Sequence, residues 1–167
     1  MGLMKSLVII AHNLRSAHNV GSLLRTAEGL GVKVILSGYT PYPLLVDDDR
    51  LPHLATKTHR QISKTALGAE LQSIWTRQID ITETITELRN QGYAIAALEQ
   101  TDSSVALPDY EMPAQLALIL GREVEGVESE VLELCDKALV IPMFGKKESF
   151  NVVQAAAMAM YTWRIPC

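Results

Sequence analysis

Five short apolar runs alternate along the chain with segments whose apolar residues recur at helical spacing, and this alternation constrains the fold most. The runs, rich in Val, Ile and Leu, are Leu7 to Ile10, Val32 to Leu36, Tyr93 to Leu98, Leu116 to Leu120 and Ala138 to Ile141. Helical spacing occurs at Val20 to Leu30, Gln61 to Leu71, Thr82 to Gln91, Val127 to Cys135 and Phe150 to Ile165. Short apolar runs of this kind are typical of buried strands. The alternation predicts an α/β fold, with a mostly parallel sheet and helices on both faces.

A sheet of this kind predicts where a ligand would bind. Ligands of parallel α/β sheets gather beyond the carboxyl ends of the strands, so we expect a site in the loops that follow them. The loop from Ser37 to Pro52 is long and rich in Pro and Asp, and is either a substrate loop or an insertion without a role. With 167 residues and no internal repeat, residues 1–167 are expected to form a single domain.

Cysteine content and hydropathy exclude several classes of protein. Cys135 and Cys167 are the only cysteines and lie far apart, which argues against zinc ribbons and disulfide frameworks and favours a reducing, cytoplasmic location. The longest strongly apolar stretch, Phe150 to Trp163, is 14 residues long and too short to span a membrane, so no membrane contact is expected. The chain has no nucleotide-binding or metal-binding motif, and we expect no metal.

The net charge of -4 hides an uneven distribution. Residues 50–69 carry four Lys or Arg and no acid, whereas residues 70–136 carry 14 acids and three Arg. A polyanion could therefore bind the basic stretch while the acidic middle faces away. The alternative is a solvated surface with uneven charge.

Three clusters of polar and small residues follow predicted strands or open predicted helices. In the first, Asn19 to Ala27, Asn19 is a plausible N-cap, and Arg25 lies nearly two helical turns later. In the second, Leu120 to Gly126, two glycines let the backbone approach a ligand, and Glu123 stands at the end of a strand. Taken singly, each has a plain alternative, an exposed helix arginine for Arg25 and an acidic first helical turn for Glu123.

The third cluster runs from Ile141 to Val152 and is followed by the small-residue segment Ala155 to Ala157. Ser149 is a plausible cap of the last predicted helix, and the preceding loop would present backbone groups to a ligand. The alanines alternatively serve close helix packing.

The order and spacing of the three clusters resemble the SpoU branch of the SPOUT RNA methyltransferases, which includes tRNA (guanosine) 2′-O-methyltransferases of the TrmH type. The segment Lys64 to Glu70 is also similar to this group, so the resemblance covers nearly the whole chain. Phe150 departs from the family pattern, which has a smaller aliphatic residue there. The extensions that many members use to grip RNA are not found, so a methyltransferase domain without an RNA-binding extension is expected.

The resemblance implies a C-terminal trefoil knot, a homodimer and S-adenosyl-L-methionine as the cofactor. General rules of chain connection do not predict a knot. By matching position, the cofactor would be bound by Leu98, Gly121, Ile141, Met143 and Ser149. The adenine would occupy an apolar slot and contact mainly backbone groups.

The resemblance also implies methyl transfer to a ribose 2′-hydroxyl of RNA, most simply of tRNA. Arg25 matches the arginine beside the ribose, and because a guanidinium stays protonated we expect it to bind phosphate and stabilise negative charge on the oxygen. The residues expected to orient Arg25, the cofactor and the ribose are Asn19, Glu123, Ser149 and Asn151.

The expected partner is RNA rather than DNA, and basic residues form the predicted RNA surface. These are Arg15, Arg50, Lys57, Arg60, Lys64, Lys146 and Lys147. Asp47 to Asp49 lie beside the stretch and count against it. Three alternatives remain at this stage: methylation of ribosomal RNA, methylation of a base or another small substrate, and a noncatalytic RNA-binding or assembly module with the same fold.

Overall fold

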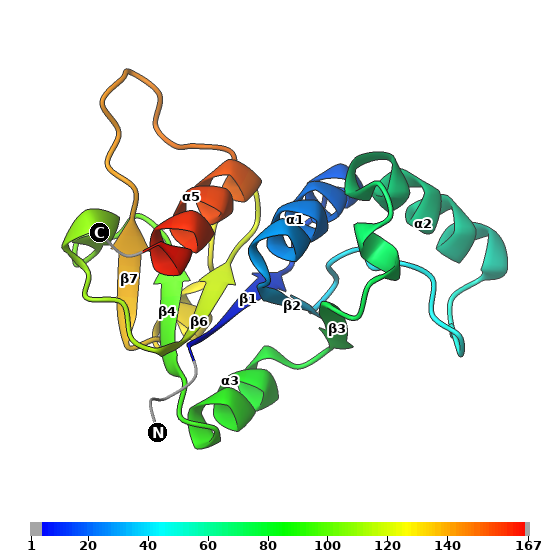
Figure 1. Cartoon of the computed structure of the whole chain (residues 1–167), viewed down its shortest axis with the longest axis horizontal. Helices are drawn as coiled ribbons and strands as arrows, with labels where there is room; N and C mark the ends of the chain where they lie inside the picture. Colours follow the sequence, from blue (N-terminus) through cyan, green and yellow to red (C-terminus); the bar gives the residue numbers. More distant parts are fainter. Residues whose placement is uncertain (1–4, 166–167) are drawn as a thin grey trace.

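The computed structural model describes residues 5–165 and contains one seven-stranded sheet (Figure 1). The strands are β1 (Ser6–His12), β2 (Lys33–Ser37), β3 (Trp75–Gln78), β4 (Ala94–Leu98), β5 (Val105–Ala106), β6 (Gln115–Leu120) and β7 (Lys137–Val140). Their order is β3-β2-β1-β6-β4-β7-β5, and every neighbouring pair is parallel. The predicted α/β fold with a parallel sheet is therefore confirmed.

Helices cover both faces of the sheet, as predicted. One face packs against α1 (Ala17–Leu30), α2 (Pro52–Ala66) and α5 (Val152–Arg164), and the other against α3 (Ile81–Asn90) and the single-turn α4 (Ser129–Leu132). Successive strand residues enter different cores, since Ile9 joins the α1 and α5 side and Ile10 the α3 side. Both side chains are fully buried, which explains why the central strands are continuous apolar runs. Two 3-10 turns, η1 (Ala69–Leu71) and η2 (Leu107–Asp109), complete the fold.

Two strands and two helices differ from the sequence prediction. The edge strands β3 and β5 were not predicted, because β3 is mostly polar and β5 has only two residues. The helix predicted from Gln61 begins at Pro52, whose fixed φ suits a first helical turn, and it ends at Ala66. In its first half only Ala55 is buried and Leu54 is exposed, so no apolar period marks it. The helix predicted over residues 127–135 is reduced to α4.

The start of α1 also differs from the prediction. Ser16 is the N-cap and accepts a hydrogen bond from the Asn19 backbone amide, so Asn19 lies inside the first turn and is not the cap. Further along α1, Gly21 touches α2, where a Cβ would lie 2.2 Å from the Ile62 carbonyl oxygen. Thr65 of α2 donates to the His18 carbonyl oxygen at 2.8 Å. The two helices therefore pack in close contact, with the backbone of α1 against α2.

The long segment between β7 and α5 extends away from the body of the fold, as the orange loop in Figure 1 shows. Within residues 5–165, no helix combines the length and apolarity that a membrane crossing requires. The trefoil knot stays a prediction from the resemblance. Cys167 lies outside the described residues.

Candidate functional site

A pocket lies at the carboxyl ends of three neighbouring strands, β4, β6 and β7, where the sheet predicted a ligand site. Its apolar part is formed by residues that include Leu98, Leu139, Ile141 and Met143. Its polar part includes the loop from Gly121 to Glu123. The structure brings all five residues predicted to bind the cofactor to this pocket: Leu98, Gly121, Ile141, Met143 and Ser149.

Gly121 allows the loop after β6 to fold back on itself. A Cβ at this position would lie 2.3 Å from both the Gly126 carbonyl carbon and the Val127 nitrogen, closer than any side chain tolerates. Arg122 and Gly126 exchange backbone hydrogen bonds of 3.1 Å across the turn. The pocket wall is therefore backbone at this point. An apolar slot with exposed backbone and a few polar groups fits an adenine nucleoside with a polar tail.

Glu123 is the acceptor that joins this loop to the start of α1. Its carboxylate accepts from the backbone amides of Arg15 and Ser16, at 3.0 to 3.2 Å, and from Asn19 Nδ2 at 3.1 Å. Burial opposes its ionisation, but the hydrogen bonds from Ser16, Arg15 and Asn19 outweigh this, so the pKa of Glu123 lies below its ordinary value. Glu123 is therefore ionised at neutral pH and holds the start of α1 through these hydrogen bonds.

Asn151 of the third cluster contacts Asn19 and so lies near Glu123. Its Oδ1 accepts from the Val153 and Gln154 amides, so Asn151 is the N-cap of α5 and Ser149, two residues earlier, is not. Its Nδ2 donates to Asn19 Oδ1 at 3.5 Å. Asn19, Glu123 and Asn151 thus form one chain of contacts, while Ser149 is exposed and lines the pocket.

Arg25 is not brought to the pocket within one chain. Its side chain is exposed on α1, does not line the pocket, and makes no hydrogen bond or ion pair with any residue between 5 and 165. It follows Asn19 by six residues, which is about 9 Å along the helix axis. A single subunit therefore holds Asn19 near Glu123 and leaves Arg25 facing outward.

Three predicted RNA-binding residues share one face of α2. Lys57, Arg60 and Lys64 line a shallow groove on this helix together with His53, and the spacing of these four residues repeats every three or four positions. All four are partly or fully exposed, and α2 contains no acid. We call these four residues the α2 basic stripe.

The other predicted RNA-binding residues are not on α2. Arg50 forms an ion pair with Asp48 at 2.5 Å, donates to the Tyr42 carbonyl oxygen and stacks on the Tyr42 ring. That arginine lowers the pKa of Asp48 through its hydrogen bond, against the effect of desolvation. Arg15 is paired with Glu125 at 2.6 Å. Lys146 and Lys147 are exposed on the loop before α5.

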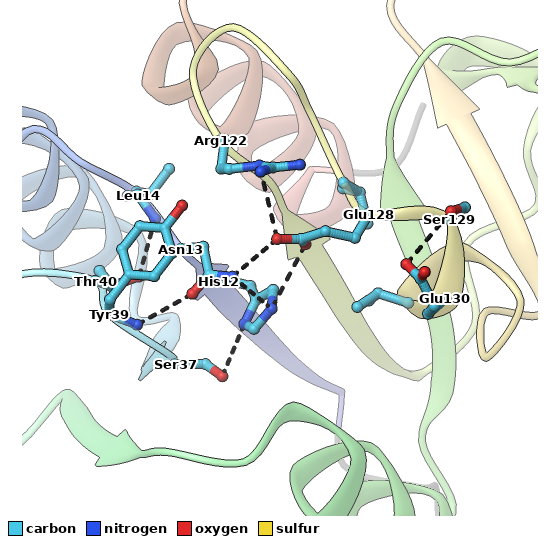
Figure 2. A network of polar contacts seen from close by, with 12 residues as sticks. His12, Asn13, Leu14, Ser37, Tyr39, Thr40, Arg122, Glu128, Ser129 and Glu130 are labelled. Atoms are coloured by element: carbon cyan, nitrogen blue, oxygen red, sulfur yellow. Dashed lines mark hydrogen bonds and ion pairs between the residues drawn. The ribbon is translucent and has the colours of Figure 1, made fainter.

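A partly buried polar network that the sequence did not reveal includes Arg122, which also lines the pocket (Figure 2). Glu128 Oε1 accepts from Asn13 Nδ2 at 2.9 Å, and His12 Nε2 and Arg122 Nε each lie 3.6 Å from a Glu128 carboxylate oxygen. His12 and Asn13 lie at the end of β1, whereas Arg122 and Glu128 lie in the segment between β6 and α4, so no local spacing pattern joins them. Among residues 5–165, no group of three or more His, Cys, Asp or Glu side chains is arranged to hold a metal ion.

The hydrogen bonds of Asn13 define the state of His12. Asn13 Oδ1 accepts from the Tyr39 amide, so its Nδ2 faces His12 Nε2 at 3.1 Å, and that ring nitrogen must be the acceptor. His12 Nδ1 is then the protonated nitrogen and donates to Ser37 Oγ at 3.1 Å. Desolvation lowers the pKa of His12, against the attraction of Glu128 and with the repulsion of Arg122, which favours the neutral ring.

The chain was compared with known protein families and structures. The SpoU rRNA methylase family matches residues 6–161 of the chain. The chain belongs to this family. The SpoU resemblance drawn from the three clusters is therefore confirmed, and the contacts among Asn19, Glu123 and Asn151 show that its three motifs meet in space.

Individual SpoU relatives are distant and mostly longer. A tRNA (guanosine(18)-2′-O)-methyltransferase of Aquifex aeolicus is 26% identical over 158 residues, covering 94% of this chain and 68% of the relative. A putative TrmH family tRNA/rRNA methyltransferase of Staphylococcus haemolyticus is 31% identical over 156 residues, covering 93% of this chain and 57% of the relative. The matched region thus covers between half and about two thirds of the length of these relatives.

Solved structures show the same fold. An rRNA methyltransferase from Sinorhizobium meliloti with bound S-adenosylmethionine superposes with a TM-score of 0.77 at 20% identity, covering 98% of this chain and 58% of that chain. A structure described as concerning the 2-OH methylation of C/U34 on tRNA has a TM-score of 0.70 at 20% identity. The match covers 95% of this chain and 94% of the other chain, so that protein has the same fold at nearly the same length.

Proposed function

We propose that this SpoU protein transfers a methyl group from S-adenosylmethionine to a ribose 2′-hydroxyl of RNA, with tRNA as the substrate. The observation that carries the proposal is that the second and third motifs line one pocket, while Asn19 of the first motif contacts Glu123 at its edge. Leu98, Ile141 and Met143 form an apolar slot of the kind an adenine ring fills, and Gly121 leaves its edge open to backbone contacts. The Aquifex relative supports ribose as the acceptor.

The cofactor supplies an electrophilic methyl group on a sulfonium sulfur. The ribose oxygen gains this methyl group, its proton leaves to solvent, and S-adenosylhomocysteine remains. In this proposal Ser149 and Asn151 orient the ligands at the pocket mouth, and Glu123 holds Asn19 in place. Because the Glu123 carboxylate already accepts hydrogen bonds from α1, its role is to position α1 rather than to take up a proton.

Arg25 completes the site from a second subunit in our proposal. Its guanidinium is exposed and without a partner among the described residues, as a group that works across an interface would be in an isolated chain. There it would bind an RNA phosphate and stabilise the charge that develops on the ribose oxygen. The functional unit proposed is therefore a homodimer with two composite sites.

The α2 basic stripe supports RNA binding outside the pocket. Lys57, Arg60 and Lys64 follow one another along a helix about 22 Å long, so they could contact successive phosphates. α2 is fastened to α1 at Gly21, and α1 carries Asn19 and Arg25. RNA bound on α2 would thus be held in a fixed relation to the methylation site. The low cysteine content supports a cytoplasmic location for this reaction.

The test is methyl transfer itself. Purified protein is incubated with radiolabelled S-adenosylmethionine and, separately, with tRNA and ribosomal RNA, and the RNA is digested to nucleosides. We expect a 2′-O-methylnucleoside from tRNA. The same product from ribosomal RNA alone would replace the tRNA proposal, and a base-methylated product would refute the ribose proposal. Cofactor binding without any labelled RNA would favour the noncatalytic module.

A further inference from the structure

Arg122 belongs to the second cluster and lines the pocket, but the function proposed above gives its side chain no role. Among the described residues that line the pocket it is the only basic one, and the acidic ones are Glu99 and Glu123. Both acids are already engaged. Glu99 accepts from the Gln100 and Val127 amides at 2.9 and 2.8 Å, and Glu123 accepts from α1. The carboxylates therefore shape the loops, while the guanidinium remains available to a ligand.

The hydrogen-bonding capacity of Arg122 is almost unused. Its side-chain nitrogens donate no hydrogen bond to any residue between 5 and 165, so its buried Nε has no hydrogen-bond partner there. The nearest acid, Glu128, is an ion-pair partner at 3.6 Å, beyond hydrogen-bonding distance. A guanidinium has five N–H donors in a planar fork, and leaving buried donors unpaired is costly. This arrangement is typical of a site completed by an anionic ligand.

Glu128 lies beside the Nε of the Arg122 guanidinium. Figure 2 shows the Glu128 carboxylate between Arg122 and His12, with Asn13 donating to it at 2.9 Å. Among residues 5–165, Arg122 is the only lysine or arginine that forms an ion pair with Glu128. Glu128 therefore lies beside the Nε of the guanidinium, and the terminal nitrogens of Arg122, which lines the pocket, donate no hydrogen bond to any residue between 5 and 165.

S-adenosylmethionine carries one anionic group, the α-carboxylate of its amino acid part. A planar guanidinium matches a carboxylate in bidentate geometry and favours it over an isolated ammonium or sulfonium. We propose that Arg122 binds the α-carboxylate of the cofactor and that Glu128 is the positioning residue that orients it. This inference rests on the proposed use of S-adenosylmethionine and assigns a specificity-determining residue to that site.

Calorimetric binding of two product analogues tests the assignment without any turnover. S-adenosylhomocysteine has the carboxylate, and its decarboxylated form, S-adenosyl-3-thiopropylamine, lacks only that group. Wild-type protein should prefer S-adenosylhomocysteine by about tenfold to a hundredfold, as expected for a charge-assisted bidentate pair. In Arg122→Leu this preference should fall to about twofold or less, while the decarboxylated analogue binds as before. Arg122→Lys should keep part of the preference.

Two controls separate the possible outcomes. Arg164→Leu removes an exposed arginine at the end of α5, outside the pocket, and should leave both affinities unchanged. Unchanged binding of the decarboxylated analogue to Arg122→Leu shows that the pocket is still folded. Failure of wild-type protein to bind either analogue would refute the cofactor proposal itself. Binding with a full preference retained in Arg122→Leu would refute only the role of Arg122.

Glu128→Gln tests the positioning role. The glutamine carbonyl can still accept from Asn13 Nδ2, but the negative charge behind Arg122 is lost. We expect the preference for S-adenosylhomocysteine to fall several-fold, with no change for the decarboxylated analogue. A purely structural role would weaken both ligands equally and would contradict the assignment. If Arg122→Leu instead lowers RNA affinity alone, the anion bound there is a phosphate and the proposal is wrong.

Discussion

Asn19 Nδ2 donates a 3.1 Å hydrogen bond to Glu123 Oε1, and this contact joins the first turn of α1 to the loop after β6. The same carboxylate accepts from the Ser16 amide, which the N-cap geometry of α1 leaves without an intrahelical partner. One side chain therefore fixes where α1 begins and shapes one wall of the pocket. Movement of the β6 loop on ligand binding would be passed directly to α1.

Replacing Glu123 should reduce both stability and activity. Glu123→Ala leaves the Arg15 and Ser16 amides and the Asn19 side chain without their acceptor, so we expect a loss of about 1 to 3 kcal/mol in the free energy of unfolding. Glu123→Gln retains one acceptor oxygen and should lose less. Urea unfolding followed by circular dichroism measures both. Equal stability of Glu123→Ala and wild type would show that the hydrogen bonds accepted by Glu123 do not stabilise the fold.

Substitution of Gly121 should damage the pocket specifically. In Gly121→Ala the new Cβ would collide with the backbone of Gly126 and Val127, so the loop must shift, at a cost of about 1 to 3 kcal/mol. We expect weaker binding of S-adenosylmethionine by calorimetry and a lower melting temperature. Gly145→Ala is the matched control, because nothing lies within 4 Å of its Cβ position. Equal effects of the two substitutions would contradict the prediction.

Arg25→Ala should lower methyl transfer by about 10² to 10³ and leave cofactor affinity nearly intact, since it removes one oriented electrostatic group. Wild-type turnover in this variant would remove Arg25 from the mechanism. Subunit mixing tests the dimer. When Arg25→Ala is refolded with Met143→Trp, which blocks the pocket, about a quarter of wild-type activity should return if Arg25 acts across the interface. No recovery would place both groups in one subunit.

Charge reversal on the α2 basic stripe should weaken RNA binding without affecting the cofactor. For the pair Lys57→Glu and Arg60→Glu we expect at least about a tenfold loss of tRNA affinity and a shallower dependence on salt. Filter binding at several salt concentrations measures both quantities. Lys33→Glu, on an exposed residue at the start of β2, changes charge away from α2 and serves as the control. A loss of the same size in the control would indicate a nonspecific charge effect.

His12 should make the fold less stable in mild acid. Its pKa in the folded protein lies below the ordinary value of 6.5, mainly because of desolvation, with Glu128 and Arg122 as the charged groups that face it. Below pH 6.5 the unfolded chain therefore binds a proton that the folded chain does not, and stability falls as the pH drops. Melting temperatures between pH 7.5 and 5.5 should decline more steeply for wild type than for His12→Gln. Parallel curves would contradict this.

The central strands show which parts of the fold sequence can predict. Ile9 and Ile10 are both buried because the two faces of β1 are covered, so the strand reads as a continuous apolar run. β3 contains Thr76, Arg77 and Gln78 and lies at the sheet edge, where burial imposes no apolar pattern. The first half of α2 was not predicted for the same reason, since only Ala55 is buried there. Sequence prediction therefore succeeded where burial was two-sided and failed at the margins.

The cap of α1 illustrates a different limit. Ser16 and Asn19 are both good capping residues, and sequence alone cannot choose between them. The choice is made by Glu123, more than a hundred residues away in the chain, which accepts from the Ser16 amide and from the Asn19 side chain. A local preference was therefore decided by a distant acceptor.

The sequence by itself determined the layered α/β class, the three clusters and their resemblance to the SpoU family, because burial period and motif spacing are local properties. The tertiary structure alone decided that Arg122, Glu128 and His12 share one network and that Arg25 stays outside the pocket of its own chain. These relations depend on which strand ends the parallel sheet brings side by side. No interval along the chain encodes that adjacency, since it follows from the order β1-β6-β4-β7.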